Sequence, residues 1–175
     1  MPKVIPELKA SLIDAARKSL LESESHDVNV RQLAQECGTA VGTVYNYFPS
    51  KEALIAEAMM SDWLDCSRSM KEDAGQEEQP LYAIRAIVAA LRNFTSRYKP
   101  MWRKYADERK SLMSLEIRHN QVITEIAEAV EKTLLRFDLL YDRNLPEIIA
   151  ELVLFASRTE DGFERIAPAL ERMLR

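Results

Sequence analysis

The sequence predicts an all-α protein, and three observations support that class. Only four glycines occur among the 175 residues, and long stretches contain neither glycine nor proline, which strands and their turns need more often. Apolar residues recur at intervals of three and four. A composition of 47% apolar and 30% charged residues is typical of a folded chain. We expect a small module at residues 1–55 and a larger helical body at residues 56–175.

The first helix is expected from about Ile5 to Leu20, and the polar segment 23–27 interrupts it. Asn29 offers a side-chain acceptor at the start of a second helix. Gly38 ends that helix, because glycine readily takes the left-handed conformation. Its buried face is formed by Val30, Leu33, Ala34 and Cys37.

A short third helix is expected over residues 41–48, with Val44 and Phe48 pointing inward. Ser50 then caps a fourth helix that continues to about Met70. The charged segment 72–80 reads as an exposed connection. Pro80, Pro100 and Pro146 each suit the first turn of a helix, and the later helices are expected at 80–98, 101–110, 111–139, 146–158 and 160–174.

Several functional classes find no support in the sequence. No apolar run approaches the roughly 18 residues of a membrane span, and the first residues lack the apolar core of an export signal. Cys37 and Cys66 lie far apart, so we predict no disulfide, no metal site, no cofactor and a cytoplasmic location. Nucleophile, P-loop, zinc-protease and dinucleotide motifs are missing, so we predict no enzyme.

Residues 30–48 form a helix, a tight glycine turn and a second helix, which is the helix-turn-helix arrangement. The second of these helices has an inward face and an outward face that carries Thr43, Tyr45, Asn46 and Tyr47. Phenol, hydroxyl and amide groups of this kind can contact phosphates and base edges of DNA. Ordinary amphipathic packing of the two tyrosines is the alternative.

The residues Leu33-Ala34, Gly38 and 41–54 resemble the N-terminal domain of TetR/AcrR-type transcriptional regulators. The run Tyr-Asn-Tyr-Phe-Pro-Ser-Lys-Glu-Ala-Leu extends well past a generic helix-turn-helix. The resemblance implies a three-helix DNA-binding domain, joined by a long fourth helix to a helical domain that binds an effector and dimerises.

The resemblance also implies roles by position. Gly42 would allow close approach to the DNA backbone, Tyr45 would enter the major groove, and Thr43, Tyr47 and Lys51 would contact phosphates. Arg31 is the candidate for reading a guanine edge, although an exposed arginine at a helix start is also common. Asn46 contacts a base or only solvent. The full predicted contact set is Arg31, Thr39, Gly42, Thr43, Tyr45, Asn46, Tyr47 and Lys51.

Departures from the family pattern favour weak, sparse contacts. Ala40 stands where many relatives have serine, Val41 where a polar or basic residue is common, and Glu24-Ser25-His26 where a glycine is usual. Residues 1–55 carry six basic and seven acidic side chains within a chain of net charge −4. We therefore expect a few phosphate contacts per subunit. A helical adaptor that has lost DNA binding is the alternative function.

In the body, the aromatic and methionine side chains could line an effector pocket or form plain core. The basic stretch 97–110 could attract an anionic effector or be a solvated face. The family's last two helices usually form a dimer interface, so we expect a homodimer, a palindromic double-stranded operator and an unknown small-molecule effector that releases a repressor. The pocket candidates are Phe94, Tyr98, Met101, Trp102, Tyr105 and Met113, and the interface candidates are Ile149, Leu152, Val153, Phe163, Ile166 and Leu170.

Overall fold

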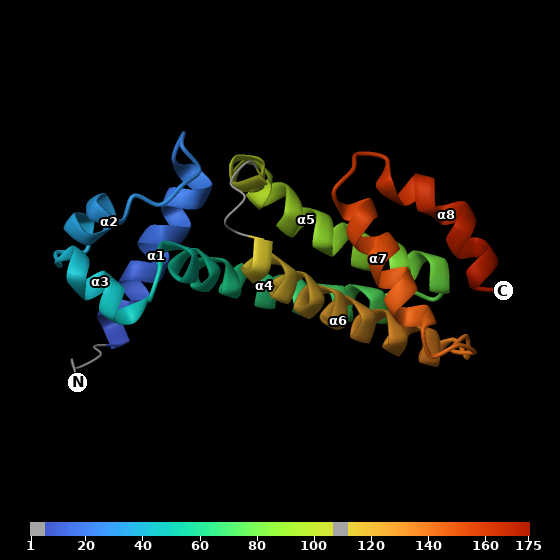
Figure 1. Cartoon of the computed structure of the whole chain (residues 1–175). Coiled ribbons are helices and arrows are strands. Elements are labelled where there is room, and N and C mark those ends of the chain that lie inside the picture. Colours follow the sequence, from blue (N-terminus) through green and yellow to red (C-terminus); the bar gives the residue numbers. More distant parts are fainter. Residues whose placement is uncertain (1–5, 107–111) are drawn as a thin grey trace. The chain divides into compact units, whose positions relative to one another are not determined.

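The computed structural model describes residues 6–106 and 112–175, with side chains described for 6–101 and 121–175. Within these ranges the chain forms eight α-helices and no strand, which confirms the predicted all-α class (Figure 1). The helices are α1 (Pro6–Glu22), α2 (Val30–Glu36), α3 (Val41–Tyr47), α4 (Lys51–Gln76), α5 (Pro80–Ala106), α6 (Leu112–Arg136), α7 (Leu145–Ser157) and α8 (Gly162–Met173).

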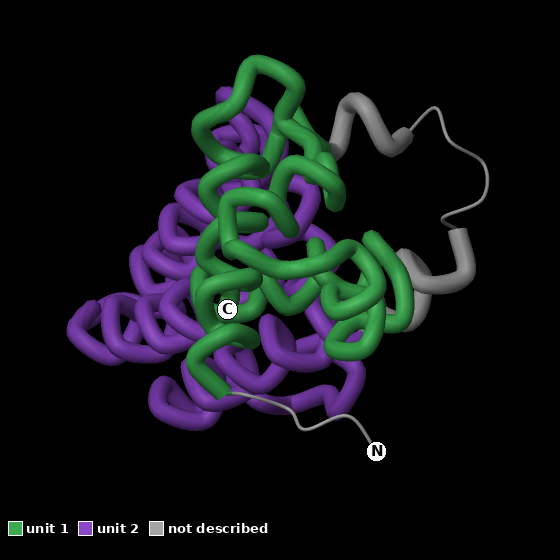
Figure 2. Tube along the Cα trace, turned by 90° about the vertical axis from the view of Figure 1, so that its left-hand side faces the viewer, with its two compact units in different colours: residues 1–63, 98–104 green, residues 64–97, 105–175 purple. Residues whose placement is uncertain are grey.

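The helices divide into two compact units (Figure 2). Unit 1 comprises residues 1–63 and 98–104, and unit 2 comprises residues 64–97 and 105–175. The predicted division between residues 55 and 56 falls inside α4. As a result, α4 and α5 each contribute residues to both units.

The core of unit 1 holds two very short helices in place. Leu12, Ala16 and Leu20 of α1 are at most 1% exposed, and so are Leu33 of α2 and Val44 of α3. Helices of seven residues are too short to be stable alone, so this packing fixes α2 and α3. One helical face of α3 is thereby committed to the core.

A partly buried ion pair and a buried hydrogen bond also belong to unit 1. Asp62 of α4 is only 7% exposed, and its Oδ1 accepts from Arg17 of α1 at 3.1 Å (Nε) and 2.7 Å (Nη2). Tyr98 of α5 donates its hydroxyl to Asp62 Oδ2 at 2.7 Å. The hydrogen bonds that Arg17 donates to the Asp62 carboxylate raise the pKa of Arg17 above its ordinary value. Three helices far apart in sequence therefore share one carboxylate.

Unit 2 is built around α7, which packs against both α6 and α8. Ile149 and Val153 of α7 are fully buried. The C-terminal carbonyls of α7 are satisfied from α5, because Thr95 donates to Ser157 O at 3.0 Å and Arg92 donates to Thr159 O at 2.7 Å in the following turn. The last carbonyls of a helix need such partners.

Two predictions about helix ends are wrong. The fourth helix continues to Gln76, so the first part of the expected connection is helical, with Ala74 buried and its carbonyl accepting from Arg136 at 2.9 Å. Pro100 does not begin a helix but lies inside α5. A proline inside a helix costs about 3 kcal/mol, and burial of Tyr98 and Met101 on either side favours continuing the helix.

Candidate nucleic-acid interface

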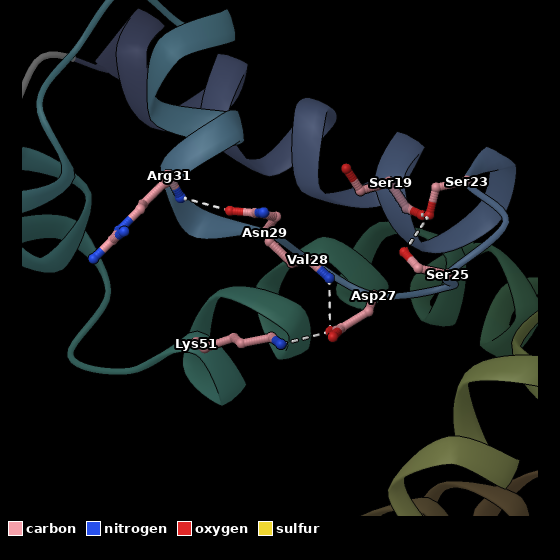
Figure 3. A network of polar contacts seen from close by, with 8 residues as sticks. All are labelled: Ser19, Ser23, Ser25, Asp27, Val28, Asn29, Arg31 and Lys51. Carbon is pink, nitrogen blue, oxygen red and sulfur yellow. Dashed lines mark hydrogen bonds and ion pairs between the residues drawn. The ribbon is translucent and has the colours of Figure 1, made fainter.

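The entry to the helix-turn-helix is fixed by side-chain caps, as predicted. Asn29 Oδ1 accepts from the backbone N–H group of Arg31 at 3.1 Å (Figure 3). It also accepts from the backbone N–H group of Gln32 at 3.2 Å. Gly38 follows α2 with φ +63°, the left-handed conformation that the sequence predicts for it. At the entry to α4, the hydroxyl of Ser50 accepts from Ala53 N at 3.1 Å. The turns that orient α3 are therefore defined by local hydrogen bonds.

The loop before α2 shows how this chain replaces the missing glycine. His26 takes φ +45°, a left-handed conformation that is uncommon for residues other than glycine. Its Nδ1 lies 3.1 Å from Leu20 O, at the end of α1. The imidazole thus lies against a main-chain carbonyl in the last turns of α1. The backbone at His26 adopts the left-handed conformation that a glycine would adopt at this position.

The outward face of α3 is polar. Tyr45 is 47% exposed and Asn46 is exposed, whereas Thr43 and Tyr47 are half-buried. The opposite face carries Val44, buried at 1% exposure. Two predicted contact residues therefore project fully outward and two sit at the edge of this face.

The start of α3 has no side-chain cap and little surrounding side-chain material. Its N-cap residue Ala40 provides no side-chain hydrogen bond. Gly42 is exposed, and a Cβ added there would meet no described atom within 4 Å. The fold of this chain thus gives no reason for a glycine at position 42, and Thr39 in the preceding turn is half-buried.

An open groove of about 640 Å³ runs beside α3 in unit 1. Its lining includes three of the predicted contact residues, Arg31, Tyr45 and Lys51, together with Asp27. Lys51 Nζ lies 2.6 Å from Asp27 Oδ1 (Figure 3). Sequence reasoning assigned Lys51 to phosphate and missed Asp27, because no helical spacing links the loop before α2 to the start of α4.

The predicted effector-pocket residues do not all lie in the same unit of the structure. Phe94 is half-buried, and Tyr98 and Met101 are buried in unit 1, where Tyr98 bonds to Asp62. The side chains of Trp102, Tyr105 and Met113 lie outside the described residues. An effector pocket formed by these side chains stays a prediction.

The predicted interface residues lie on α7 and α8 and are mostly buried within one protomer. Ile149, Val153 and Leu170 are fully buried, Phe163 and Ile166 nearly so, and Leu152 is half-buried. On the same helix α7, Ile148 is 48% and Phe155 44% exposed. The apolar surface left for a partner is therefore carried by the neighbours of the predicted residues.

The cysteines are shielded. Burial raises the pKa of Cys66 to about 12, and its Sγ donates to Ala90 O at 3.6 Å. Burial also raises the pKa of Cys37, which is half-buried. Neither thiol is activated as a nucleophile. Among the described residues, no group of three metal-binding side chains comes together.

Residues 12–58 match the family described as bacterial regulatory proteins, tetR family. The HTH-type transcriptional regulator BetI of Brucella anthropi is 33% identical over 98 residues, which are 55% of this chain and 50% of that protein. The HTH-type transcriptional regulator UidR of Escherichia coli K12 is 32% identical over 54 residues, 31% of this chain and 28% of that protein. The chain spans about half the length of the BetI relatives it matches.

Solved structures extend the likeness to the whole fold. A chain described as a TetR-family transcriptional regulator from Rhodococcus sp. has a TM-score of 0.67 at 16% identity, covering 98% of this chain and 100% of that one. The fatty acid degradation regulator FadR from Bacillus halodurans has a TM-score of 0.58 at 18% identity, covering 98% and 97%. None of the helices in the described part of this chain is long and apolar enough to cross a membrane.

Proposed function

We propose that this chain is a transcriptional regulator of the TetR family, which binds an operator as a homodimer and represses transcription until an effector releases it. Residues 12–58 match that family, and the regulator BetI is 33% identical over 98 residues. The observation that carries the DNA-binding part is the outward face of α3, which exposes Tyr45 and Asn46 beside a glycine whose Cβ space is empty. Such a surface suits a DNA groove, since it allows close approach and offers hydrogen-bonding groups.

The proposed contacts follow from this face. Tyr45 and Asn46 would reach base edges, while Thr43, Tyr47 and the turn residue Thr39 would contact phosphates. Arg31 and Lys51 line the groove beside α3 and would add positive charge there. With so few cations, binding depends on placed contacts, and log K should fall with log salt by about 0.9 for each phosphate neutralised.

A homodimer supplies the second recognition helix. On α7 the side chains of Ile148 and Phe155 are nearly half-exposed, and Leu152 lies between them in sequence. These positions recur at four and three residues, so they share one helical face. We expect this face to pack against a second copy, and Phe155→Asp should shift the protein from dimer to monomer in sedimentation equilibrium.

Effector binding would oppose DNA binding. Linkage requires that a ligand which weakens operator affinity is itself bound more weakly in the presence of operator, by the same factor. The curated relatives are named as transcriptional regulators, and we propose that the body of this chain senses an effector and carries out no catalysis. Such a role requires the cytoplasmic location predicted from the sequence.

Fluorescence anisotropy with DNA from upstream of the protein's own gene tests the DNA-binding proposal. Tyr45→Ala should weaken binding at least about tenfold, as expected for loss of a base contact. Tyr82→Ala is the matched control, because Tyr82 on α5 is 46% exposed, close to the 47% of Tyr45, but lies in unit 2. Absence of binding at low salt would instead support the adaptor function, which the bare N-terminus of α3 at Ala40 favours.

A further inference from the structure

Asp27 places a carboxylate in the groove that carries proposed DNA contacts. Arg31, Tyr45 and Lys51 line this groove, and Asp27 is the one acidic residue among the residues that line it. Its Oδ1 lies 2.6 Å from Lys51 Nζ (Figure 3). The ammonium group assigned to a phosphate is therefore already bound to an anion in the DNA-free protein.

Both partners of this ion pair are held in place. The backbone N–H of Val28 donates to the same Asp27 oxygen at 2.7 Å, which anchors the carboxylate in the loop before α2. Lys51 is the first residue of α4, directly after the capping Ser50. The side chains are 19% exposed for Asp27 and 30% for Lys51, so solvent and salt screen the pair less than a fully exposed one.

We propose that Asp27 competes with DNA phosphates for Lys51 and thereby lowers the affinity of the protein for DNA of any sequence. This inference rests on the proposed DNA-binding function. Carboxylate and phosphate oxygens offer an ammonium group the same charge-assisted hydrogen bonds. Lys51 gains on binding only the difference between the two partners, and Asp27 then repels the phosphate that displaces it.

The competition acts on affinity and leaves sequence preference unchanged. A phosphate contact carries no direct information about the base sequence. A lysine whose charge is already balanced by a neighbouring carboxylate also neutralises less phosphate charge and releases fewer counterions. The wild-type protein should therefore show a shallower salt dependence than its number of cations implies.

A positioning role for Asp27 would have the opposite sign. If the carboxylate mainly held Lys51 in the orientation that reaches a phosphate, its removal would weaken DNA binding. The two roles are therefore separated by the direction of one measured change.

The experiment compares Asp27→Asn with Glu24→Gln by anisotropy on the upstream duplex and on a scrambled duplex, over about 0.05–0.2 M salt. Asparagine keeps an oxygen that can accept from Val28 N, so the loop is preserved, and thermal melting checks this. Glu24→Gln makes the same charge change at an exposed position of the same loop.

Asp27→Asn should tighten binding about two- to fivefold per protomer, the range of a partly exposed ion pair, and equally on both duplexes. The salt slope should steepen by up to about 0.9 per protomer. Glu24→Gln should change affinity less than about twofold, since only long-range charge is altered. Equal tightening by both variants would overturn the proposal, as would unchanged or weaker binding of Asp27→Asn.

Lys51→Gln completes the test as a double-mutant cycle. The proposal requires that Lys51→Gln weakens binding more in the Asp27→Asn background than in the wild type, because the Asp27 carboxylate no longer competes with phosphate for the Lys51 ammonium group. A smaller loss in that background would show that Asp27 positions Lys51, and would overturn the proposal. If neither the wild type nor Asp27→Asn binds any duplex, the proposed function itself falls, and this inference falls with it.

Discussion

The α2–α3 pair and the α7–α8 pair are both helix pairs joined by a short turn. Gly38 lies in the first turn and Gly162 is the first residue of α8, and the two glycines are present for different reasons. Gly38 has φ +63°, and a Cβ there would meet no described atom within 4 Å. Gly162 has an ordinary φ, but a Cβ would lie 2.0 Å from Ala156 O and 2.5 Å from Thr159 Oγ1. Position 38 therefore requires a left-handed backbone conformation, whereas position 162 requires a residue without a Cβ.

The two pairs also differ in what they leave exposed. The short helix α3 buries Val44 and turns Tyr45 and Asn46 outward, whereas α7 buries most of its length and exposes the apolar Ile148 and Phe155. Polar groups on an exposed face suit a DNA groove, and apolar groups suit a second protein chain. The same kind of helix pair can therefore serve different partners.

Substitution of the two glycines by alanine should give the largest effect. Gly162→Ala should lower the free energy of unfolding by about 3 kcal/mol, because the added Cβ overlaps a backbone carbonyl that cannot move without shifting α7. Gly38→Ala should cost about 1 kcal/mol, the price of a left-handed alanine. Urea unfolding monitored by circular dichroism measures both.

Equal losses of unfolding free energy in the two alanine variants would contradict the distinction between a conformational requirement at Gly38 and a steric requirement at Gly162. A larger loss for Gly38→Ala would reverse it. The m-value should stay the same in both variants, since neither substitution changes the surface exposed on unfolding.

The helix caps of the two pairs should also differ in their contribution to stability, but by less than the two glycines. Asn29 caps two N–H groups of α2, so Asn29→Ala should cost about 1 kcal/mol. Asp161 occupies the N-cap position of α8 without a side-chain hydrogen bond, so Asp161→Ala should cost at most about 0.5 kcal/mol through the helix dipole. Thermal unfolding at matched pH checks both, and a larger loss for Asp161→Ala would show that the α8 cap forms in solution.

The two cysteines should give the smallest effect, seen in reactivity. Burial raises the pKa of the Cys66 thiol to about 12, so its thiolate fraction in the folded protein should still grow roughly tenfold per pH unit above pH 9. In Cys37→Ser, which leaves Cys66 alone, labelling with a disulfide reagent should be slow at pH 8 and rapid in urea. A labelling rate that levels off near pH 9 would contradict the raised pKa.

The same raised pKa bears on stability at high pH. An unfolded thiol ionises near its ordinary value of 9, while folded Cys66 stays protonated up to about 12. The folded state then binds more protons over that interval, so the contribution of Cys66 to stability falls as pH rises from about 9 to 12. Cys66→Ala should remove this part of the alkaline loss.

Local features of the α2–α3 region could be predicted from sequence because they depend on neighbouring residues. The cap at Asn29, the left-handed Gly38 and the buried Val44 all follow from spacing and residue type, and the structure confirms them. The family resemblance covered the same segment. Prediction worked where the signal lies within about one helical turn.

Features that depend on distant residues could not be predicted. The ion pair of Arg17 with Asp62 joins positions 45 residues apart, and that of Asp27 with Lys51 joins a loop to a helix start. Pro100 inside α5 is likewise a case where tertiary burial outweighs a local preference for helix termination. These contacts exist only once the helices have packed.

Photo-crosslinking compares the two exposed faces most directly. A benzophenone amino acid in place of Tyr45 of α3, and in a separate protein in place of Phe155 of α7, would be irradiated in the presence of the upstream duplex. We predict that position 45 crosslinks to DNA, and that position 155 crosslinks to a second copy of the chain. If DNA is bound but position 45 crosslinks only to protein or not at all, the outward face of α3 is not the DNA-binding surface.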